Sequence, residues 1–114
     1  MAANELLVKR IREKLSQRDD VEEKTMFRGM TFMVDGKMCI NVARDEAMFR
    51  IDPEKQAELV AAKECSVMRM KGRAYNGYLL VSENNLIHNE DLEFWISEAL
   101  AYNKTAKSSK RKAK

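Results

Sequence analysis

At 114 residues the chain has the length of one domain, and its composition is that of a globular protein: 45% hydrophobic residues, four glycines and one proline. No apolar run approaches the roughly 20 residues that span a bilayer, and the amino terminus lacks a hydrophobic signal core. We therefore expect a cytoplasmic protein with no membrane contact. The two cysteines form no CxxC pair, which favours free thiols over a disulfide framework.

The positive charge lies at the end of the sequence. The basic residues beyond position 103 are Lys104, Lys107, Lys110, Arg111, Lys112 and Lys114. These six charges exceed the +3 of the whole chain, and no acidic residue accompanies them, so residues 1–103 carry a net −3. Net charge therefore predicts no basic nucleic-acid-binding face on the body. We expect two parts: an α+β domain at 1–103 and a disordered basic tail at 104–114.

The first predicted element is an amphipathic helix over residues 4–18. Asn4 can cap it, and Leu7, Ile11 and Leu15 recur at four-residue spacing to form one apolar stripe. The polar residues from Gln17 to Glu23 are expected to end the helix.

Four strands are predicted next. Residues 25–28 and 30–34 flank Gly29, and the Asp35-Gly36 pair is a strong signal for a tight hairpin into residues 37–43. A fourth strand covers residues 46–51. Strict alternation predicts the side-chain directions of the last two strands. In the strand over 37–43, one face is expected to carry Met38, Ile40 and Val42, and the other face Cys39, Asn41 and Ala43. In the strand over 46–51, one face is expected to carry Ala47, Phe49 and Ile51, and the other face Met48 and Arg50.

The second half of the sequence begins with Asp52-Pro53, which is a favourable helix start. This pair predicts a helix that runs to about Lys63. Its inward residues are expected to be Ala57, Val60 and Ala61.

Strands over 66–70 and 75–81 flank a turn at Gly72, and Gly77 marks a bulge. A last helix begins near Asn89, with its apolar residues at helical spacing. They are Leu92, Trp95, Ile96, Ala99 and, continuing the stripe, Tyr102. The tight turns make the strands antiparallel. The fold class is therefore α+β: two layers, about six strands, helices at both termini and one inserted mid-chain.

The chain resembles the N-terminal domain of the bacterial competence regulator TfoX, also called Sxy. The segments that carry the resemblance are Lys9-Arg10-Ile11-Arg12, Lys24-Thr25-Met26-Phe27-Arg28-Gly29-Met30, Phe32-Met33-Val34-Asp35-Gly36-Lys37-Met38, Asp52-Pro53, Gly72-Arg73, Asn76-Gly77-Tyr78 and Leu92-Phe94-Trp95-Ile96-Ala99-Leu100. At Arg28 the family often has a second glycine. The resemblance implies an antiparallel α+β domain in a non-enzymatic regulatory setting and offers no catalytic residue. Full-length regulators add a helical domain, and this sequence ends before that domain would begin.

A protein partner, from transcription or competence control, is therefore the expected ligand. Arg28, Lys71, Arg73 and Tyr75 flank glycine turns and are the candidate contacts for a partner or an anion, because arginine presents a bidentate fork. Solvated turn residues are the alternative interpretation. A second hypothesis is an enzyme or small-ligand protein. Its pocket would unite Arg73, Tyr75 and Tyr78 with Cys39 or Asp35.

The remaining candidates predict no catalytic, metal or cofactor site. His88 is the only histidine, and neither cysteine is predicted at a helix start that would lower its thiol pKa. Seven internal methionines concentrate in the sheet region. They either fill the core or form an exposed partner or dimer surface on the uncovered sheet face. The tail alternatively supports weak, nonspecific contact with nucleic acid.

Overall fold

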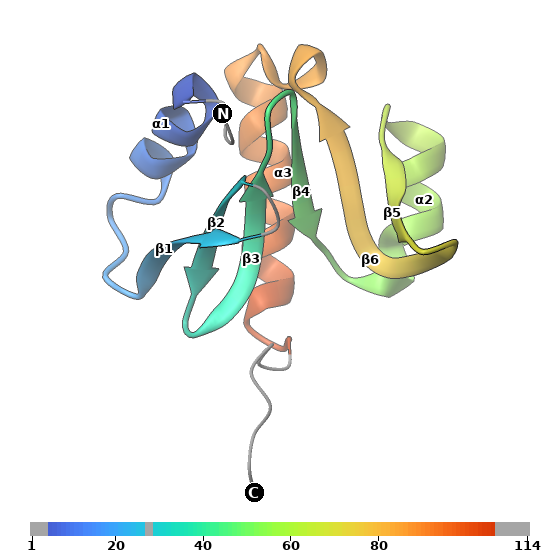
Figure 1. Cartoon of the computed structure of the whole chain (residues 1–114), viewed down its shortest axis with the longest axis horizontal. Coiled ribbons are helices and arrows are strands. Elements are labelled where there is room, and N and C mark those ends of the chain that lie inside the picture. Colours follow the sequence, from blue (N-terminus) through green and yellow to red (C-terminus); the bar gives the residue numbers. More distant parts are fainter. Residues whose placement is uncertain (1–4, 27–28, 107–114) are drawn as a thin grey trace, which may run out of the picture.

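The computed structural model describes residues 5–26 and 29–106. Over these residues the chain forms three α-helices and one six-stranded antiparallel sheet with strand order β1-β2-β3-β4-β6-β5 (Figure 1). The elements are α1 Glu5–Lys14, β1 Val21–Met26, β2 Gly29–Val34, β3 Lys37–Val42, β4 Glu46–Arg50, α2 Gln56–Ala62, β5 Ser66–Met70, β6 Arg73–Ser82 and α3 Asn89–Asn103. The predicted α+β class, with its helices at both ends and one mid-chain, is confirmed.

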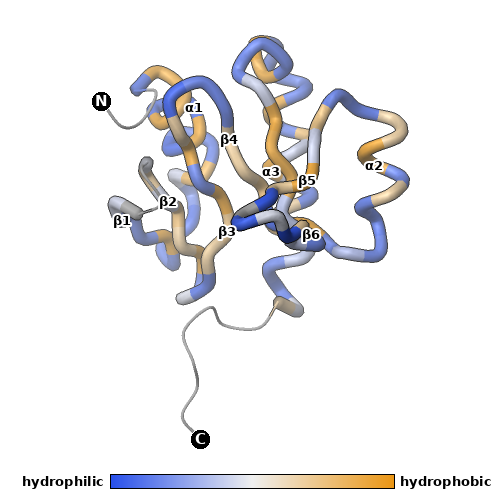
Figure 2. The backbone as a smooth tube through the Cα atoms, turned by 45° about the vertical axis from the view of Figure 1, so that its right-hand side comes forward, coloured by the Kyte–Doolittle hydropathy of each residue, from blue (hydrophilic) through white to orange (hydrophobic). Residues whose placement is uncertain are grey.

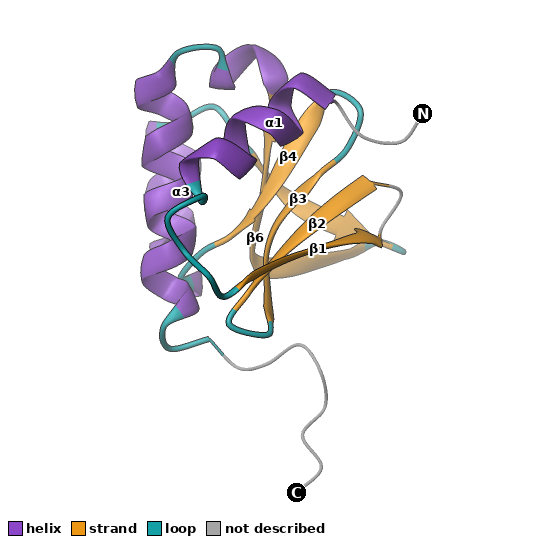
Figure 3. Cartoon of the chain, turned by 90° about the vertical axis from the view of Figure 1, so that its left-hand side faces the viewer, coloured by secondary structure: helices purple, strands orange, loops and turns teal. Residues whose placement is uncertain are grey.

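The helices gather on one side of the sheet. Figure 3 shows α1 and α3 together on that side and the strands on the other. Leu59 of α2 joins the same main core, as do Leu7 of α1 and Trp95 of α3. We call the opposite side of the sheet the helix-free face.

The amino-terminal helix packs through the predicted stripe, because Leu7, Ile11 and Leu15 are buried. It ends at Lys14, however, and β1 begins at Val21, so the boundaries predicted for the first helix and first strand were wrong. The polar residues after Val21 already pair with β2 as an edge strand. Polar and charged residues are common on edge strands, which must avoid pairing with other chains.

The Asp35-Gly36 hairpin is confirmed, and both residues have positive φ angles, 55° and 75°, which suits a tight turn between twisted strands. The strict alternation predicted for the next strand was wrong. Phe32 pairs with Ile40 and Met33 with Met38, so Cys39 is an extra residue, a β-bulge. In consequence Met38 lies in a different cluster from Ile40 and Val42, and Cys39 joins the main core with those two residues.

In β4 the predicted alternation holds: Ala47 and Phe49 lie in the main core, as does Ile51 after the strand, and Met48 lies opposite. Asp52 caps the following turn, where its Oδ1 accepts from the Glu54 amide at 2.9 Å. The inward residues predicted for the middle helix were wrong. Leu59 is buried, whereas Ala57, Val60 and Ala61 are exposed.

The β5–β6 hairpin turns at Lys71 and Gly72, with φ angles of 54° and 79°. Pairing between these strands is irregular between Val67 and Arg69, opposite the stretch of β6 that contains Gly77. The glycine has a φ of 89°, and its amide donates to Oε1 of Gln56 at 2.6 Å. Leu92, Trp95, Ile96 and Ala99 of the last helix are buried as predicted, whereas Tyr102 is only partly buried. Trp95 stacks on Phe49 with ring centroids 5.6 Å apart.

Candidate functional site

The β5–β6 hairpin carries three of the four predicted contact residues. Lys71, Arg73 and Tyr75 are all exposed and lie within one stretch of five residues at the turn. Figure 2 colours this turn as hydrophilic. Arg28 lies outside the described residues. The structure therefore brings a lysine, an arginine and a tyrosine together on one projecting turn.

An arginine–tyrosine cluster continues this surface toward the rest of the sheet. The Tyr75 and Tyr78 rings meet edge to face at 6.4 Å. The Arg50 guanidinium lies 5.6 Å from the Tyr78 ring centroid and 5.7 Å from that of Tyr102, distances typical of cation–π contacts. Its Nη1 also donates to the Met38 carbonyl at 3.4 Å.

Sequence reasoning missed Arg50 and Tyr102 as members of this site. They come from the end of β4 and the end of α3, about fifty positions apart in the sequence. The alternation of β4 already placed Arg50 on the side of Met48, but nothing local indicated that α3 would end beside it.

A second, smaller hydrophobic cluster lies on the helix-free face, and we call it the methionine cluster. Its buried members are Met33, Met38 and Met48, and Met68, Tyr78 and Leu80 pack against them partly buried. The three buried methionines are 4–6% exposed. These residues fill a core rather than form an exposed methionine surface, so the core-filling interpretation applies to them. Met30 packs instead against the main core.

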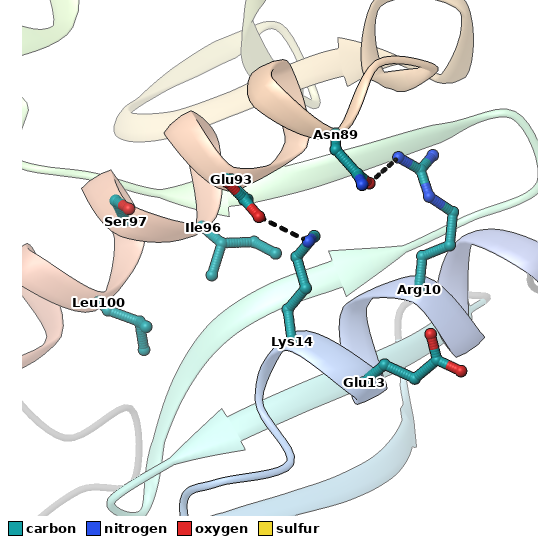
Figure 4. Close-up of a pocket in the computed structure, with 8 residues that line it drawn as sticks. All are labelled: Arg10, Glu13, Lys14, Asn89, Glu93, Ile96, Ser97 and Leu100. Carbon is teal, nitrogen blue, oxygen red and sulfur yellow. Dashed lines mark hydrogen bonds and ion pairs between the residues drawn. The ribbon is translucent and has the colours of Figure 1, made fainter.

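A groove of about 530 Å³ lies between α1 and α3 (Figure 4). Ile96 and Leu100 line it, and the Lys14–Glu93 ion pair, 2.8 Å between Nζ and Oε2, spans it. Arg10 donates to the Leu86 carbonyl at 2.7 Å, and to two further oxygens near the start of α3. The charged groups at the rim thus join one helix to the other.

The alternative pocket is only partly assembled. Tyr75 and Tyr78 touch, but Cys39 lies in the main core, on the other side of the sheet from Tyr78. Burial raises the pKa of the Cys39 thiol to about 12, which opposes formation of a nucleophilic thiolate. Asp35 lies at the β2–β3 turn, 3.7 Å from the Lys37 ammonium. Neither proposed nucleophilic or acidic group joins the tyrosines.

The other polar candidates are dispersed. His88 is exposed before α3, where its carbonyl accepts from the Asp91 amide at 3.1 Å. Burial also raises the pKa of the half-buried Cys65 thiol. Residues 5–26 and 29–106 contain no group of three or more His, Cys, Asp or Glu placed to hold a metal ion, and none of their helices is long and apolar enough to cross a membrane. Lys104 is exposed, and the other five basic residues of the predicted tail lie outside the described residues.

Comparison with known families gives one assignment. The family model described as the TfoX N-terminal domain matches residues 13–102, which include β1 to β6 and most of α3. Neither curated proteins nor solved structures give a match. The matched region spans more than three quarters of the sequence, and the chain therefore belongs to the TfoX N-terminal domain family.

Proposed function

We propose that this protein is a non-enzymatic regulatory module of the cytoplasm that acts by contacting another protein, in transcription or competence control. Membership of the TfoX N-terminal domain family, which is not a known enzyme family, supports the regulatory setting. The observation that carries the proposal is the exposed β5–β6 turn and its continuation into the arginine–tyrosine cluster.

The chemistry of this surface suits a protein partner. Tyrosine and arginine are enriched at protein interfaces, where they combine apolar contact area with hydrogen-bonding groups. Tyr75 is 38% exposed although it is large and aromatic. Lys71 and Arg73 add two positive charges beside it on a body whose net charge is negative. An acidic segment of the partner, with an apolar side chain that packs on Tyr75, complements this turn in charge and in apolar contact.

The test compares two double charge reversals in the full chain. The hairpin variant is Lys71→Glu/Arg73→Glu, and the matched control is Lys9→Glu/Lys24→Glu, which changes net charge equally at exposed positions on α1 and β1. Each tagged protein is cross-linked in cells, and the captured proteins are identified and then titrated as purified partners. We expect the wild type and the control to bind the same partner, and the hairpin variant to bind it at least tenfold more weakly.

The regulatory role is measured in the same strains. If the proposal holds, the hairpin variant changes competence-gene expression in the same direction as a deletion of the chain, and the control does not. Equal binding by both variants, or unchanged gene expression after deletion, would contradict the proposal.

A further inference from the structure

The strand β1 leaves one edge of the sheet open. It stands first in the strand order, so β2 is its only strand neighbour among the described residues. Figure 3 views the molecule from the side of β1, which lies in front of the other strands. The backbone groups of β1 that point away from β2 can therefore pair with a further strand, as on other sheet edges.

Two opposite charges lie on the helix-free face of this strand. Glu22 pairs with Met33 of the methionine cluster, and Lys24, two residues later, points to the same face. Both residues are exposed, and neither forms an ion pair within 4 Å with another described residue. Glu23 lies between them and points to the other face, where Arg12 of α1 donates two hydrogen bonds of 2.7 Å to its carboxylate. One face of β1 thus carries an acid and a base, both available to a partner.

The order of these charges is self-complementary. When two copies of β1 pair antiparallel about a twofold axis at Glu23, Glu22 of each copy lies directly opposite Lys24 of the other, on the same face of the sheet. Opposite charges in such cross-strand pairs stabilise the pairing, and the symmetry produces two of them. Moving the axis by one residue would place Glu22 opposite Glu22, or Lys24 opposite Lys24, which is unfavourable. The charges therefore select one register.

We propose that two copies of this chain associate through their β1 strands, in the antiparallel register centred on Glu23, and join their sheets edge to edge. Main-chain hydrogen bonds supply the affinity in such strand additions, and the Glu22–Lys24 pairs fix the register. At the axis the two Glu23 carboxylates face each other, but each is neutralised by the two hydrogen bonds from its own Arg12. Charges on an edge strand ordinarily prevent association, whereas here a second copy compensates them.

This dimer lies away from the hairpin turn. The strands β1 and β5 form opposite edges of the sheet, so pairing through β1 leaves the β5–β6 turn of both copies exposed. The proposal therefore goes beyond the proposed function. A chain that no longer dimerises still presents Lys71, Arg73 and Tyr75, and loss of the dimer and loss of partner binding are separate results.

The experiment measures the molar mass of the full chain by light scattering. An edge strand of six residues buries little area and should give a weak dimer, so the concentration runs from about 1 µM to about 1 mM. We expect the mass to rise toward that of two chains. Glu22→Lys places lysine opposite lysine, and Lys24→Glu places glutamate opposite glutamate, so each variant alone should dimerise at least about tenfold more weakly.

Mixing these two variants gives the sharpest result. In the mixed dimer every charge again faces its opposite, so the mixture should associate about as strongly as the wild type although neither variant does so alone. The double variant Glu22→Lys/Lys24→Glu should recover in the same way. Glu58→Lys and Arg44→Glu are the matched controls, because they make the same changes of charge at exposed positions of α2 and the β3–β4 turn, and both should dimerise like the wild type.

Three results would overturn the proposal. The first is a wild-type chain that stays monomeric at millimolar concentration. The second is a dimer whose strength the two single variants of β1 leave unchanged, which would place the contact elsewhere on the molecule. The third is a mixture of the two single variants that associates no better than either variant alone.

Discussion

The two faces of the sheet are buried in different ways. The face toward α1 and α3 is covered by helices, and its central residues, such as Phe49, Ile40 and Val81, are fully buried. The helix-free face has no such layer, yet Met48 is only 4% exposed. On the second face the burial comes from neighbouring side chains of the same sheet, above all Met68, Tyr78 and Leu80.

This difference shows that an uncovered sheet face need not be an exposed apolar surface. Unbranched methionine side chains have three rotatable bonds and can lie along the sheet to cover one another. Branched and aromatic side chains, in contrast, stand up from a sheet and fill the space beneath a helix at high packing density. Substitutions on the helix-covered face should therefore cost more than comparable ones on the helix-free face.

The largest expected contrast is in cysteine reactivity. Cys39 belongs to the helix-covered face, where burial raises the pKa of its thiol from the usual 9.0 to about 12, and this alone lowers the thiolate fraction about a thousandfold. Cys65 is only half-buried. A disulfide reagent at pH 8 should label one thiol in the native protein and two after unfolding. Rapid labelling of both thiols in the native chain would show that the helix layer opens readily.

The second contrast compares neighbouring residues of β4 that point to opposite faces. Phe49→Ala should lower the free energy of unfolding by about 3–5 kcal/mol, because the ring stacks on Trp95 and its removal leaves a cavity under α3. Met48→Ala should cost about 2 kcal/mol, the lower end for such a truncation, because the flexible neighbours can partly close the space. Urea unfolding of both variants measures the two losses.

Met48→Leu serves as the control for volume and should cost less than about 1.5 kcal/mol. Equal losses for Phe49→Ala and Met48→Ala would contradict the difference between the faces. Such a result would mean that the methionine cluster is packed as rigidly as the main core.

The sequence predicted features that depend on a few neighbouring residues better than features that depend on pairing between distant segments. Local patterns were sufficient for the turn at Asp35-Gly36 and for the buried residues of α3, because turn chemistry and helical periodicity act over a few residues. The bulge at Cys39 was not predictable, since it depends on how β2 and β3 pair. The burial of Met48 was equally hidden, because it depends on the position of Met68, twenty residues away.

The candidate site also combines residues that local sequence identifies with residues that only the fold brings together. The exposed hairpin residues Lys71, Arg73 and Tyr75 could be identified from their neighbouring glycine. Their continuation through Arg50 to Tyr102 could not, because three separate elements meet there. Polarity also led to a wrong start for the first strand, because the charged residues Glu22 and Glu23 belong to an edge strand. Pairing between distant segments is the information that a local reading lacks.

A smaller effect is expected where the two faces meet, at Arg50. Arg50→Ala removes the cation between the Tyr78 and Tyr102 rings and should cost about 1–2 kcal/mol, at about 0.5–1 kcal/mol for each contact. Arg50→Lys keeps the charge and should retain part of this stability. Equal losses for the two variants would show that the planar guanidinium, rather than its charge, is what the rings require.

The smallest effect concerns the ion pair that joins α1 to the edge strand β1. Nε and Nη2 of Arg12 each donate to a carboxylate oxygen of Glu23 at 2.7 Å, but the Arg12 side chain is 54% exposed. A double-mutant cycle with Arg12→Ala and Glu23→Ala should therefore give a coupling of only about 0.2–1 kcal/mol.

The pH dependence of that coupling has a defined sign. The hydrogen bond from Arg12 lowers the pKa of the Glu23 carboxyl below its ordinary value, so the folded state binds the proton less readily than the unfolded state. The coupling is complete above the unfolded pKa of about 4.3 and disappears as the pH falls through the lower folded value. Molar salt should weaken it as well, because the pair is exposed. A coupling that persisted in acid would mean that apolar contact between the two side chains, not charge, holds the helix layer to the edge of the sheet.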